Sequence, residues 1–308
     1  MREIHTPETL EDLSAVSRRI YAEKLFTKMA DGDIGAQYEF AGLVDMVIRD
    51  FRDANDQLED TAHTGEFSSH AACGFLYQQP RVTGYLSALR SEPTPESVID
   101  LGTGPGALLA LASAVYHQPS RIDALEINYQ SVLAARKVAE LYGLADEVEI
   151  HHVDAETHPL EEVDLCVTET FGQVLTSEPG VKLQRRYGQV ARRLLPAAAR
   201  VYASATFNGE KLNEWQEAGY VDFRTIGETY QGEIQFDWRR GEDPQFAFWT
   251  GLLTEEGGLL IPYAADEIAT AVRIPNSFVP EPSDDGKAMV TFEIAHSTEK
   301  PFAQLAQT

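Results

Sequence analysis

Apolar residues recur at steps of three or four over about the first fifty positions of the chain, which is the period of an amphipathic helix. Thr6 and Pro7 begin this stretch as an N-cap and a first-turn proline. The first predicted helix presents on one face Leu10, Leu13, Val16, Ile20, Leu25 and Met29. After a break at DGDIG, a second predicted helix carries Phe40, Leu43, Met46, Val47 and Phe51. We therefore expect residues 1–62 to form an N-terminal helical segment.

The pattern changes near Ser97, where short β-rich runs begin to alternate with longer segments rich in Ala and Leu. The predicted strands are SVIDLG, RIDALEI, EVEIHHV, VDLCVTE and ARVYASAT. The predicted helices between them are ALLALASAVYH, YQSVLAARKVAELYG and QRRYGQVARRLL. Strands that alternate with helices indicate an α/β fold with a parallel, Rossmann-like sheet that is covered on both faces. This domain is expected over residues 63–206.

Helical patterns become rare beyond about Phe207. The runs FAFWTGLL, EIATAVRI and KAMVTFEIA are predicted strands, separated by turns that contain Gly, Pro and Asp. We expect residues 207–308 to form a mainly antiparallel, β-barrel-like domain.

The formal net charge of the chain is −24, from 25 basic and 49 acidic residues. Binding of nucleic acid needs a surface rich in Lys and Arg, so this charge argues against a nucleic-acid partner. A basic cluster of Arg185, Arg186, Arg192 and Arg193 lies at helical spacing and is expected to be a solvated helix face.

Two cysteines, Cys73 and Cys166, lack the spacing of metal ligands or of a CxxC motif, so neither a disulfide nor a metal site is expected. The N-terminal residues contain no apolar signal core, and no apolar run approaches the roughly 18 residues of a membrane span. These features predict a cytoplasmic protein in a reducing compartment, without a membrane partner.

The first predicted strand runs directly into a glycine-rich turn, Asp100-Leu101-Gly102-Thr103-Gly104-Pro105-Gly106-Ala107. In an open α/β sheet, ligands bind at the carboxyl ends of the strands, where glycine lets the backbone approach closely. The turn also fits the dinucleotide pattern GxGxxA, with Glu126 about twenty residues further on. NAD is therefore an alternative ligand for this turn.

Three features favour S-adenosyl-L-methionine as the cofactor. Asp100 suits a ligand with a cationic amino group, and Pro105 leaves fewer N–H donors for phosphates. The segment after the third strand offers an acceptor for an adenine amino group, and Glu126 is expected to bind the ribose hydroxyls. The predicted cofactor residues of this region are Asp100, Gly102, Gly104, Gly106, Glu126, Asp154, Ala155 and Glu156. A turn with a purely structural role is the other alternative.

The segments VIDLGTGPG, ALEIN and TETFGQVLTSE together resemble the class I S-adenosylmethionine-dependent methyltransferases, and specifically the protein arginine methyltransferases. The resemblance runs from about Phe67 to about Leu260. It implies that Arg81, in FLYQQPRVTGYLSAL, pairs with the methionine carboxylate of the cofactor. It also implies that Glu169 and Glu178, nine residues apart, are the catalytic residues that hold a target guanidinium.

A pair of carboxylates suits this role chemically. A guanidinium is planar, permanently charged and carries five donors, so one carboxylate can bind it bidentately while a second fixes its rotation. Negative charge around it also favours lone-pair character on the attacking nitrogen. We assign orientation to Glu169, and orientation together with proton acceptance to Glu178. A helix cap or a surface position is the alternative for Glu178.

The residues expected to line the substrate pocket are Phe75, Phe171 and Trp249, of which Phe75 and Phe171 depart from the pattern of this family. The segment AFW, which ends at Trp249, stands where the family has Thr-His-Trp, and TF, which ends at Phe171, stands where it has Trp-Met. Phe75 stands in place of a methionine. These changes favour a small guanidino substrate, most simply free L-arginine, in specialised metabolism.

Other functions stay open at this point. They are methylation of protein arginine, methylation of another small-molecule amine or hydroxyl group, and a role as an inactive cofactor-binding regulator. The resemblance implies a homodimer, for which Phe40, Phe51 or the segment 207–240 are candidate contacts.

Overall fold

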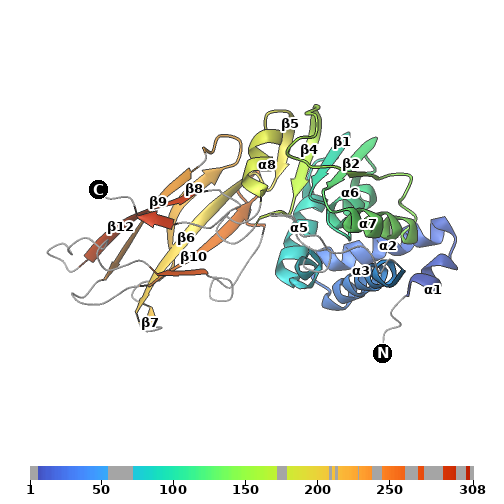
Figure 1. The fold of residues 1–308 in the computed structure, drawn as a ribbon, viewed down its shortest axis with the longest axis horizontal. Coiled ribbons are helices and arrows are strands. Elements are labelled where there is room, and N and C mark those ends of the chain that lie inside the picture. The colour runs from blue at the N-terminus through green and yellow to red at the C-terminus, as the bar shows by residue number, and fades with distance from the viewer. Residues whose placement is uncertain are drawn as a thin grey trace. The chain divides into compact units, whose positions relative to one another are not determined.

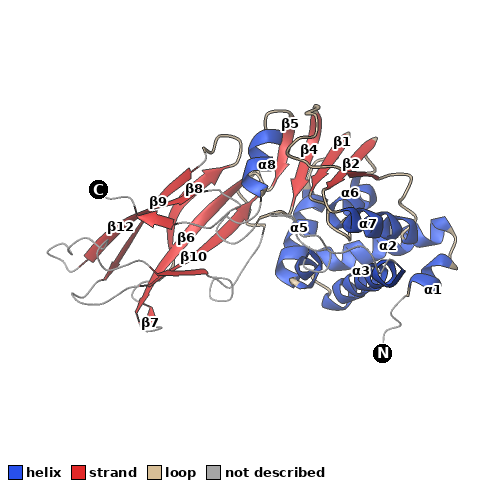
Figure 2. Ribbon diagram, in the orientation of Figure 1, coloured by secondary structure: helices blue, strands red, loops and turns tan. Residues whose placement is uncertain are grey.

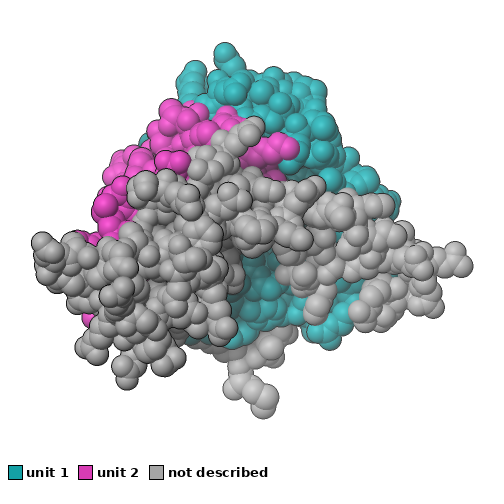
Figure 3. All heavy atoms as spheres, turned by 60° about the vertical axis from the view of Figure 1, so that its left-hand side comes forward, with its two compact units in different colours: residues 1–169, 186–195 teal, residues 170–185, 196–308 magenta. Residues whose placement is uncertain are grey.

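The computed structural model describes residues 6–54, 72–171, 179–207, 210–211, 214–227, 229–237, 245–260, 270–273, 287–295 and 303–305. The chain divides into two compact units, which Figure 3 colours separately. Unit 1 comprises Met1–Glu169 and Arg186–Leu195, and unit 2 comprises Thr170–Arg185 and Pro196–Thr308. The expected domain boundaries after residues 62 and 206 stay predictions.

Unit 1 is built on a five-stranded sheet with the order β3-β2-β1-β4-β5, in which every strand pair is parallel. The strands are β1 (Ser97–Leu101), β2 (Arg121–Glu126), β3 (Glu149–His152), β4 (Val163–Thr168) and β5 (Ala191–Leu195). Helix α6 (Leu108–His117) connects β1 to β2, helix α7 (Tyr129–Leu141) connects β2 to β3, and both pack on the strands they join. Figure 2 shows this alternation, which confirms the predicted α/β fold class.

Further helices of unit 1 pack on α6 and α7. Helix α2 (Ala15–Ala30) contacts α6, and α3 (Ile34–Ala54) contacts α7 (Figure 1). Helix α5 (Gln79–Ser91) lies against α2 and α6, while α1 (Pro7–Glu11) and the 3₁₀ helix η1 (Cys73–Tyr77) both contact α3. None of the helices in the described ranges combines the length and the apolar character that crossing a membrane requires.

The predicted first helix is in fact two helices, α1 and α2. Ser14 is the N-cap of α2, and its hydroxyl accepts a hydrogen bond from the Ser17 N–H at 3.2 Å. Leu10, Leu25 and Met29 are buried as predicted, whereas Val16 and Ile20 are 69% and 45% exposed. The predicted apolar face was therefore wrong at Val16 and Ile20, because a new helix begins after Ser14 and its buried face is not continuous with that of α1.

Helix α3 confirms the second predicted helix. Phe40, Leu43 and Val47 are buried along one side of it, and the Phe40 ring stacks on Tyr142 with a centroid distance of 5.8 Å. Because Phe40 is 0% exposed, it is not available to contact a second copy of the chain. The suggestion that Phe40 forms a dimer contact was therefore wrong.

The fifth strand of the parallel sheet is not the one we predicted. QRRYGQVARRLL, residues 184–195, was predicted as a helix but contains only the end of α8 (Gly180–Tyr187) and then the strand β5. A turn over residues 188–190 separates them, so the four arginines of the basic cluster do not share a helix face. ARVYASAT lies in β6 (Ala198–Phe207), an antiparallel strand of unit 2. Apolar runs of similar length predict a strand without saying which sheet it joins.

Unit 2 contains two antiparallel sheets, which confirms the antiparallel character predicted for this part of the chain. In the first sheet, β6 pairs with β7 (Glu210–Lys211), β8 (Gln216–Asp222) and β10 (Gln245–Leu253), and β10 pairs with β11 (Thr270–Arg273). The second sheet has the order β13 (Ala303–Leu305), β12 (Lys287–Ala295), β9 (Thr229–Asp237). Closure into a barrel stays a prediction.

Gly143 offers a test of how α2 packs on α7. It has a positive φ of 68°, and a Cβ there would lie 2.8 Å from the backbone oxygen of Ala15. Gly143→Ala combines backbone strain with a clash, so we expect a loss of about 1–3 kcal/mol in the free energy of unfolding, measured by urea denaturation.

Gly42→Ala is the matched control, because nothing lies within 4 Å of a Cβ at this position in α3. We expect no loss of stability there, since alanine is the better helix former. Equal losses in the two variants would contradict the packing of α2 on the end of α7.

Candidate functional site

The carboxyl ends of β1, β2 and β3 are joined by backbone hydrogen bonds. The N–H groups of Gly102 and Thr103 donate to the Leu125 carbonyl at 2.9 and 3.0 Å, and the Val153 N–H donates to the Glu126 carbonyl at 2.9 Å. The three segments that carry most of the predicted cofactor residues therefore lie side by side. This edge is where open α/β sheets bind ligands.

The three glycines of the turn have different roles. Gly102 and Gly104 have φ values of 69° and 65°, a region that favours glycine. Among the described residues, no heavy atom lies within 4 Å of a Cβ on Gly104, whereas a Cβ on Gly106 would lie 3.3 Å from the side chains of Leu76, Phe40 and Val44. Gly104 therefore leaves open space above the turn, and Gly106 allows α3 and η1 to pack against it.

Asp100 stabilises the glycine turn through hydrogen bonds of its side chain. Its side chain is 2% exposed, and Oδ2 accepts hydrogen bonds from the Thr103 hydroxyl at 2.6 Å and from the Ala110 N–H at 3.1 Å. Ala107, the N-cap of α6, makes no side-chain capping bond, so Asp100 supplies an acceptor for the first turn of this helix. Contact between Asp100 and a cofactor stays a prediction.

The environment of Asp100 favours its neutral form. The pKa of Asp100 is raised to about 7. Burial is the largest cause and the charge of Glu126 acts in the same direction, whereas the hydrogen bonds from Thr103 and Ala110 act against the rise. The carboxyl groups of Asp100 and Glu126 thus lie near enough for the charge of one to affect the other.

Glu126 lies against the turn on its other side. It is 9% exposed, its Oε2 accepts from the Gly104 N–H at 2.9 Å, and its Oε1 accepts from the Asn128 N–H at 2.7 Å. The Gly104 donor is therefore already engaged by a carboxylate, which would repel a diphosphate. This geometry disfavours the dinucleotide alternative and leaves lone pairs of Glu126 for hydroxyl groups.

The segment after β3 forms a tight turn. Asp154 Oδ1 accepts from the Glu156 N–H at 2.8 Å, and the Asp154 carbonyl accepts from the His158 N–H at 3.0 Å. The Ala155 carbonyl accepts from the Tyr187 hydroxyl at 3.1 Å, and burial raises the pKa of that hydroxyl to about 12. The turn is thus stabilised by hydrogen bonds among its own residues and by one hydrogen bond from Tyr187 at the end of α8.

Arg81 and Glu169 form an ion pair, a contact that sequence reasoning missed. Arg81 comes from α5 and Glu169 follows β4, and their side chains are only 16% and 18% exposed. Arg81 Nη2 also donates to the Glu169 carbonyl at 3.2 Å, and its guanidinium carbon lies 5.6 Å from the centroid of the Phe75 ring. The Thr168 hydroxyl donates to the Leu101 carbonyl at 2.7 Å, which ties this end of β4 to β1.

Three predicted residues are outside this arrangement. Glu178 and the side chain of Trp249 lie outside the described residues, although the backbone of Trp249 belongs to β10. Phe171, in unit 2, is 5% exposed and stacks on Phe223 with a centroid distance of 5.0 Å. The structure thus brings together Arg81, Glu169 and Phe75, and it gives Phe171 a place in the core of unit 2.

Comparison with solved structures finds the same fold in arginine methyltransferases. The chain aligns with a crystal structure of PRMT6 at a TM-score of 0.59 and 13% identity, over 79% of this chain and 100% of that one. It aligns with the Trypanosoma brucei PRMT1 enzyme-prozyme heterotetrameric complex with AdoHcy at a TM-score of 0.53 and 14% identity, over 72% of this chain and 86% of that one. At these identities the likeness establishes the fold.

A shorter match comes from the curated proteins. Over 72 residues the chain is 40% identical to ribosomal protein L11 methyltransferase of Rhodopseudomonas palustris (strain BisB5). This match covers 23% of the chain and 23% of that relative. No protein-family model matches the chain.

Replacement of Asp100 by asparagine tests the buried carboxylate. The folded-state pKa of about 7 lies above the ordinary 3.8, so the folded chain retains a proton that the unfolded chain releases. The stability from this group is fully present below about pH 4 and is lost as the pH rises through about 7. Asparagine keeps an acceptor but does not titrate. We therefore expect the stability of Asp100→Asn relative to the parent to rise from about pH 4 to about pH 7 and to level off above that, measured by urea denaturation.

The exposed Asp146 provides the control, and Asp146→Asn should leave the pH dependence of the parent unchanged. A stability difference between Asp100→Asn and the parent that does not vary with pH would show that Asp100 is ionised across this range.

Proposed function

We propose that the protein is an S-adenosylmethionine-dependent N-methyltransferase that acts on a guanidino group, most simply that of free L-arginine or a related small molecule. The observation that carries this proposal is the ion pair between Glu169 and Arg81. It places a guanidinium on the Glu169 carboxylate, at the end of a strand that is tied to the strand before the glycine turn. The fold, shared with structures of arginine methyltransferases, supports it.

The residues around the turn fit the cofactor. Open space above Gly104 allows a ligand to approach the backbone, and the Glu126 carboxylate can accept hydrogen bonds from ribose hydroxyls. Asp154 is proposed as the acceptor for the adenine amino group, and Arg81 as the partner of the methionine carboxylate. When bound, the cofactor supplies a methyl group activated by a sulfonium. AdoHcy, which remains after such a transfer, is present in the Trypanosoma brucei complex.

Glu169 and Glu178 are proposed to hold the substrate guanidinium from two directions. Glu169 fixes its position, and the surrounding low exposure strengthens the electrostatic attraction. Negative charge near two of the nitrogens leaves lone-pair character on the third, which would take the methyl group as the carbon–sulfur bond of the sulfonium breaks and its electron pair passes to sulfur. The proton that this nitrogen loses is proposed to pass to Glu178. Holding the reacting atoms in line contributes further, because proximity can supply several kcal/mol.

Methylation of protein arginine is the second candidate. The names of the similar proteins favour it, since they include arginine methyltransferases and a ribosomal protein methyltransferase. The departures at Phe75 and at the segments TF and AFW, which end at Phe171 and Trp249, favour a small substrate instead. A homodimer, with Phe51 or the segment 207–240 as its contact, stays part of the proposal.

Glu169→Gln tests whether the Glu169 carboxylate binds the substrate guanidinium. Glutamine keeps the size of the side chain but removes its charge, so we expect turnover to fall on the order of 100-fold or more, the scale seen when one preorganised electrostatic contact is lost. Binding of S-adenosylhomocysteine, measured by calorimetry, should change by less than about tenfold. The control is Glu162→Gln, because Glu162 is exposed. Unchanged turnover in Glu169→Gln would rule out the assigned role.

The substrate is tested by mass spectrometry with the purified protein, labelled cofactor and a panel of guanidines. We expect a higher kcat/KM for free L-arginine than for arginine-containing peptides. A far higher value for a peptide would support the protein-substrate candidate. Methylation only of compounds that lack a guanidine or amidine group would overturn the proposal.

A further inference from the structure

A cluster of two carboxylates and an imidazole lies on β2 and β3, outside the site described above. The parallel register pairs Asp123 with Glu149, and Leu125 with His151. Because side chains alternate between the two faces of a strand, Asp123, Glu149 and His151 share one face. One ligand atom of each lies within 4.8 Å of the others.

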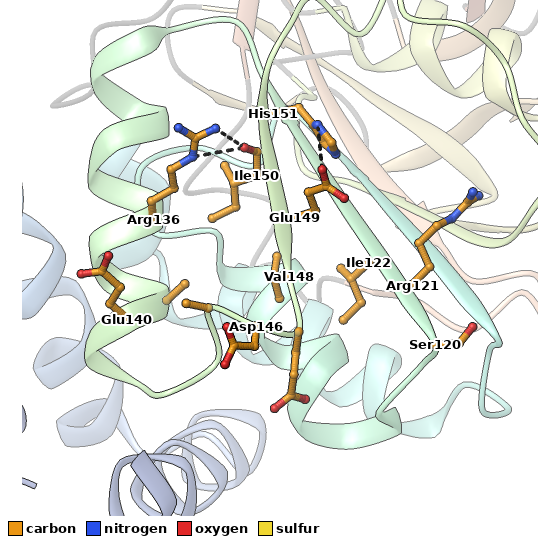
Figure 4. A pocket seen from close by; sticks show the side chains of 13 residues that line it. Ser120, Arg121, Ile122, Arg136, Glu140, Asp146, Val148, Glu149, Ile150 and His151 are labelled. Carbon is orange, nitrogen blue, oxygen red and sulfur yellow. Dashed lines mark hydrogen bonds and ion pairs between the residues drawn. The ribbon is translucent and has the colours of Figure 1, made fainter. Parts of the chain in front are cut away.

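The geometry points to a divalent-metal site formed by Asp123, Glu149 and His151. His151 Nε2 lies 2.9 Å from Asp123 Oδ1, and His151 Nδ1 lies 4.0 Å from Glu149 Oε1. Figure 4 shows the His151 and Glu149 side chains pointing toward each other. The site is independent of the proposed methyl transfer.

His158 lies near the cluster, in the loop that follows β3. Its ring centroid lies 6.2 Å from that of His151, and its carbonyl accepts from Arg186 Nη2 at 2.6 Å. Its ring nitrogens do not belong to the group of ligand atoms within 4.8 Å of one another, so the proposed site consists of Asp123, Glu149 and His151.

The donor set favours zinc or a similar transition metal. Imidazole nitrogen combined with carboxylate oxygen suits Zn²⁺, Ni²⁺ and Co²⁺, whereas Mg²⁺ and Ca²⁺ prefer oxygen alone. Asp123 and His151 are largely buried, with side chains 19% and 29% exposed, whereas Glu149 is 76% exposed. The cluster is thus more than a set of exposed acids.

Arg121 orients Asp123 without using the oxygen that faces His151. Arg121 Nε lies 3.2 Å from Asp123 Oδ2, while its Nη1 lies 2.8 Å from Glu161 Oε2. An outer partner on the second oxygen of a ligating carboxylate is typical of metal sites. The carboxylates of Asp123, Glu149 and Glu161 against the guanidinium of Arg121 leave a formal charge of −2, which a divalent cation would balance.

An ion can reach the cluster from solvent. Arg121, Glu149 and His151 also line an open cavity of about 570 Å³ at this edge of the sheet, together with residues of α7 (Figure 4). The expectation from sequence that the chain has no metal site is revised by this proposal.

The test is titration of the full chain, freed of metal with a chelator, with Zn²⁺ alone in a calorimeter. We expect one equivalent to bind in the micromolar range or tighter, and Mg²⁺ not to compete. Asp123→Asn and His151→Gln should each weaken binding at least about tenfold. Because His151→Gln keeps a side chain of similar polarity, circular dichroism is expected to confirm that it folds.

His152→Ala is the matched control, since this exposed neighbour lies with its Nε2 3.0 Å from the Ile127 carbonyl and outside the cluster. It should bind Zn²⁺ within about twofold of the parent. Zn²⁺ should also raise the Tm of the parent and of His152→Ala but not that of His151→Gln. Absence of binding to the parent, or equal affinity in all variants as expected for adventitious surface binding, would overturn the proposal.

Discussion

Two buried carboxylates position the glycine turn, and the candidate site depends on them. Asp100 links the end of β1 to the first turn of α6, and Glu126 links the end of β2 to Gly104. Burial raises the pKa of Asp100 to about 7, and the nearby charge of Glu126 adds to this rise, so a negative charge at Asp100 is costly. A cationic ligand above the turn would offset this cost, whereas a diphosphate would add to it. The arrangement therefore suits a sulfonium cofactor better than a dinucleotide.

The Arg81–Glu169 ion pair gives the proposed function its second constraint. Both side chains are largely buried, so neither charge can be left without a partner at low cost. Under the proposed function each group changes partner: Arg81 turns to the carboxylate of the cofactor, and Glu169 to the guanidinium of the substrate. When Arg81 binds the cofactor, Glu169 loses its partner and binds the substrate guanidinium more favourably. Binding of the cofactor and binding of the substrate would therefore be coupled.

The sequence predicted those features that depend on local pattern. The strand before Gly102, the turn itself and the acid at Glu126 were all predicted, because a parallel sheet brings the carboxyl ends of its strands to one edge. The role of Asp100 as a distant cap for Ala110 was not predicted, since it depends on how α6 is placed after the turn. The same holds for the contact between Arg81 and Glu169, which are 88 residues apart. The local pattern also assigned β6 instead of β5 to the parallel sheet. The sheet to which a strand belongs depends on which strands it pairs with, and the local pattern does not show this.

The account is tested most directly by a crystal structure of the protein with S-adenosylhomocysteine and L-arginine. It predicts the substrate guanidinium within hydrogen-bond distance of the Glu169 carboxylate, and Arg81 against the carboxylate of the cofactor product. A structure in which both ligands are bound, Arg81 remains the sole partner of Glu169 and the arginine guanidinium lies elsewhere would contradict it.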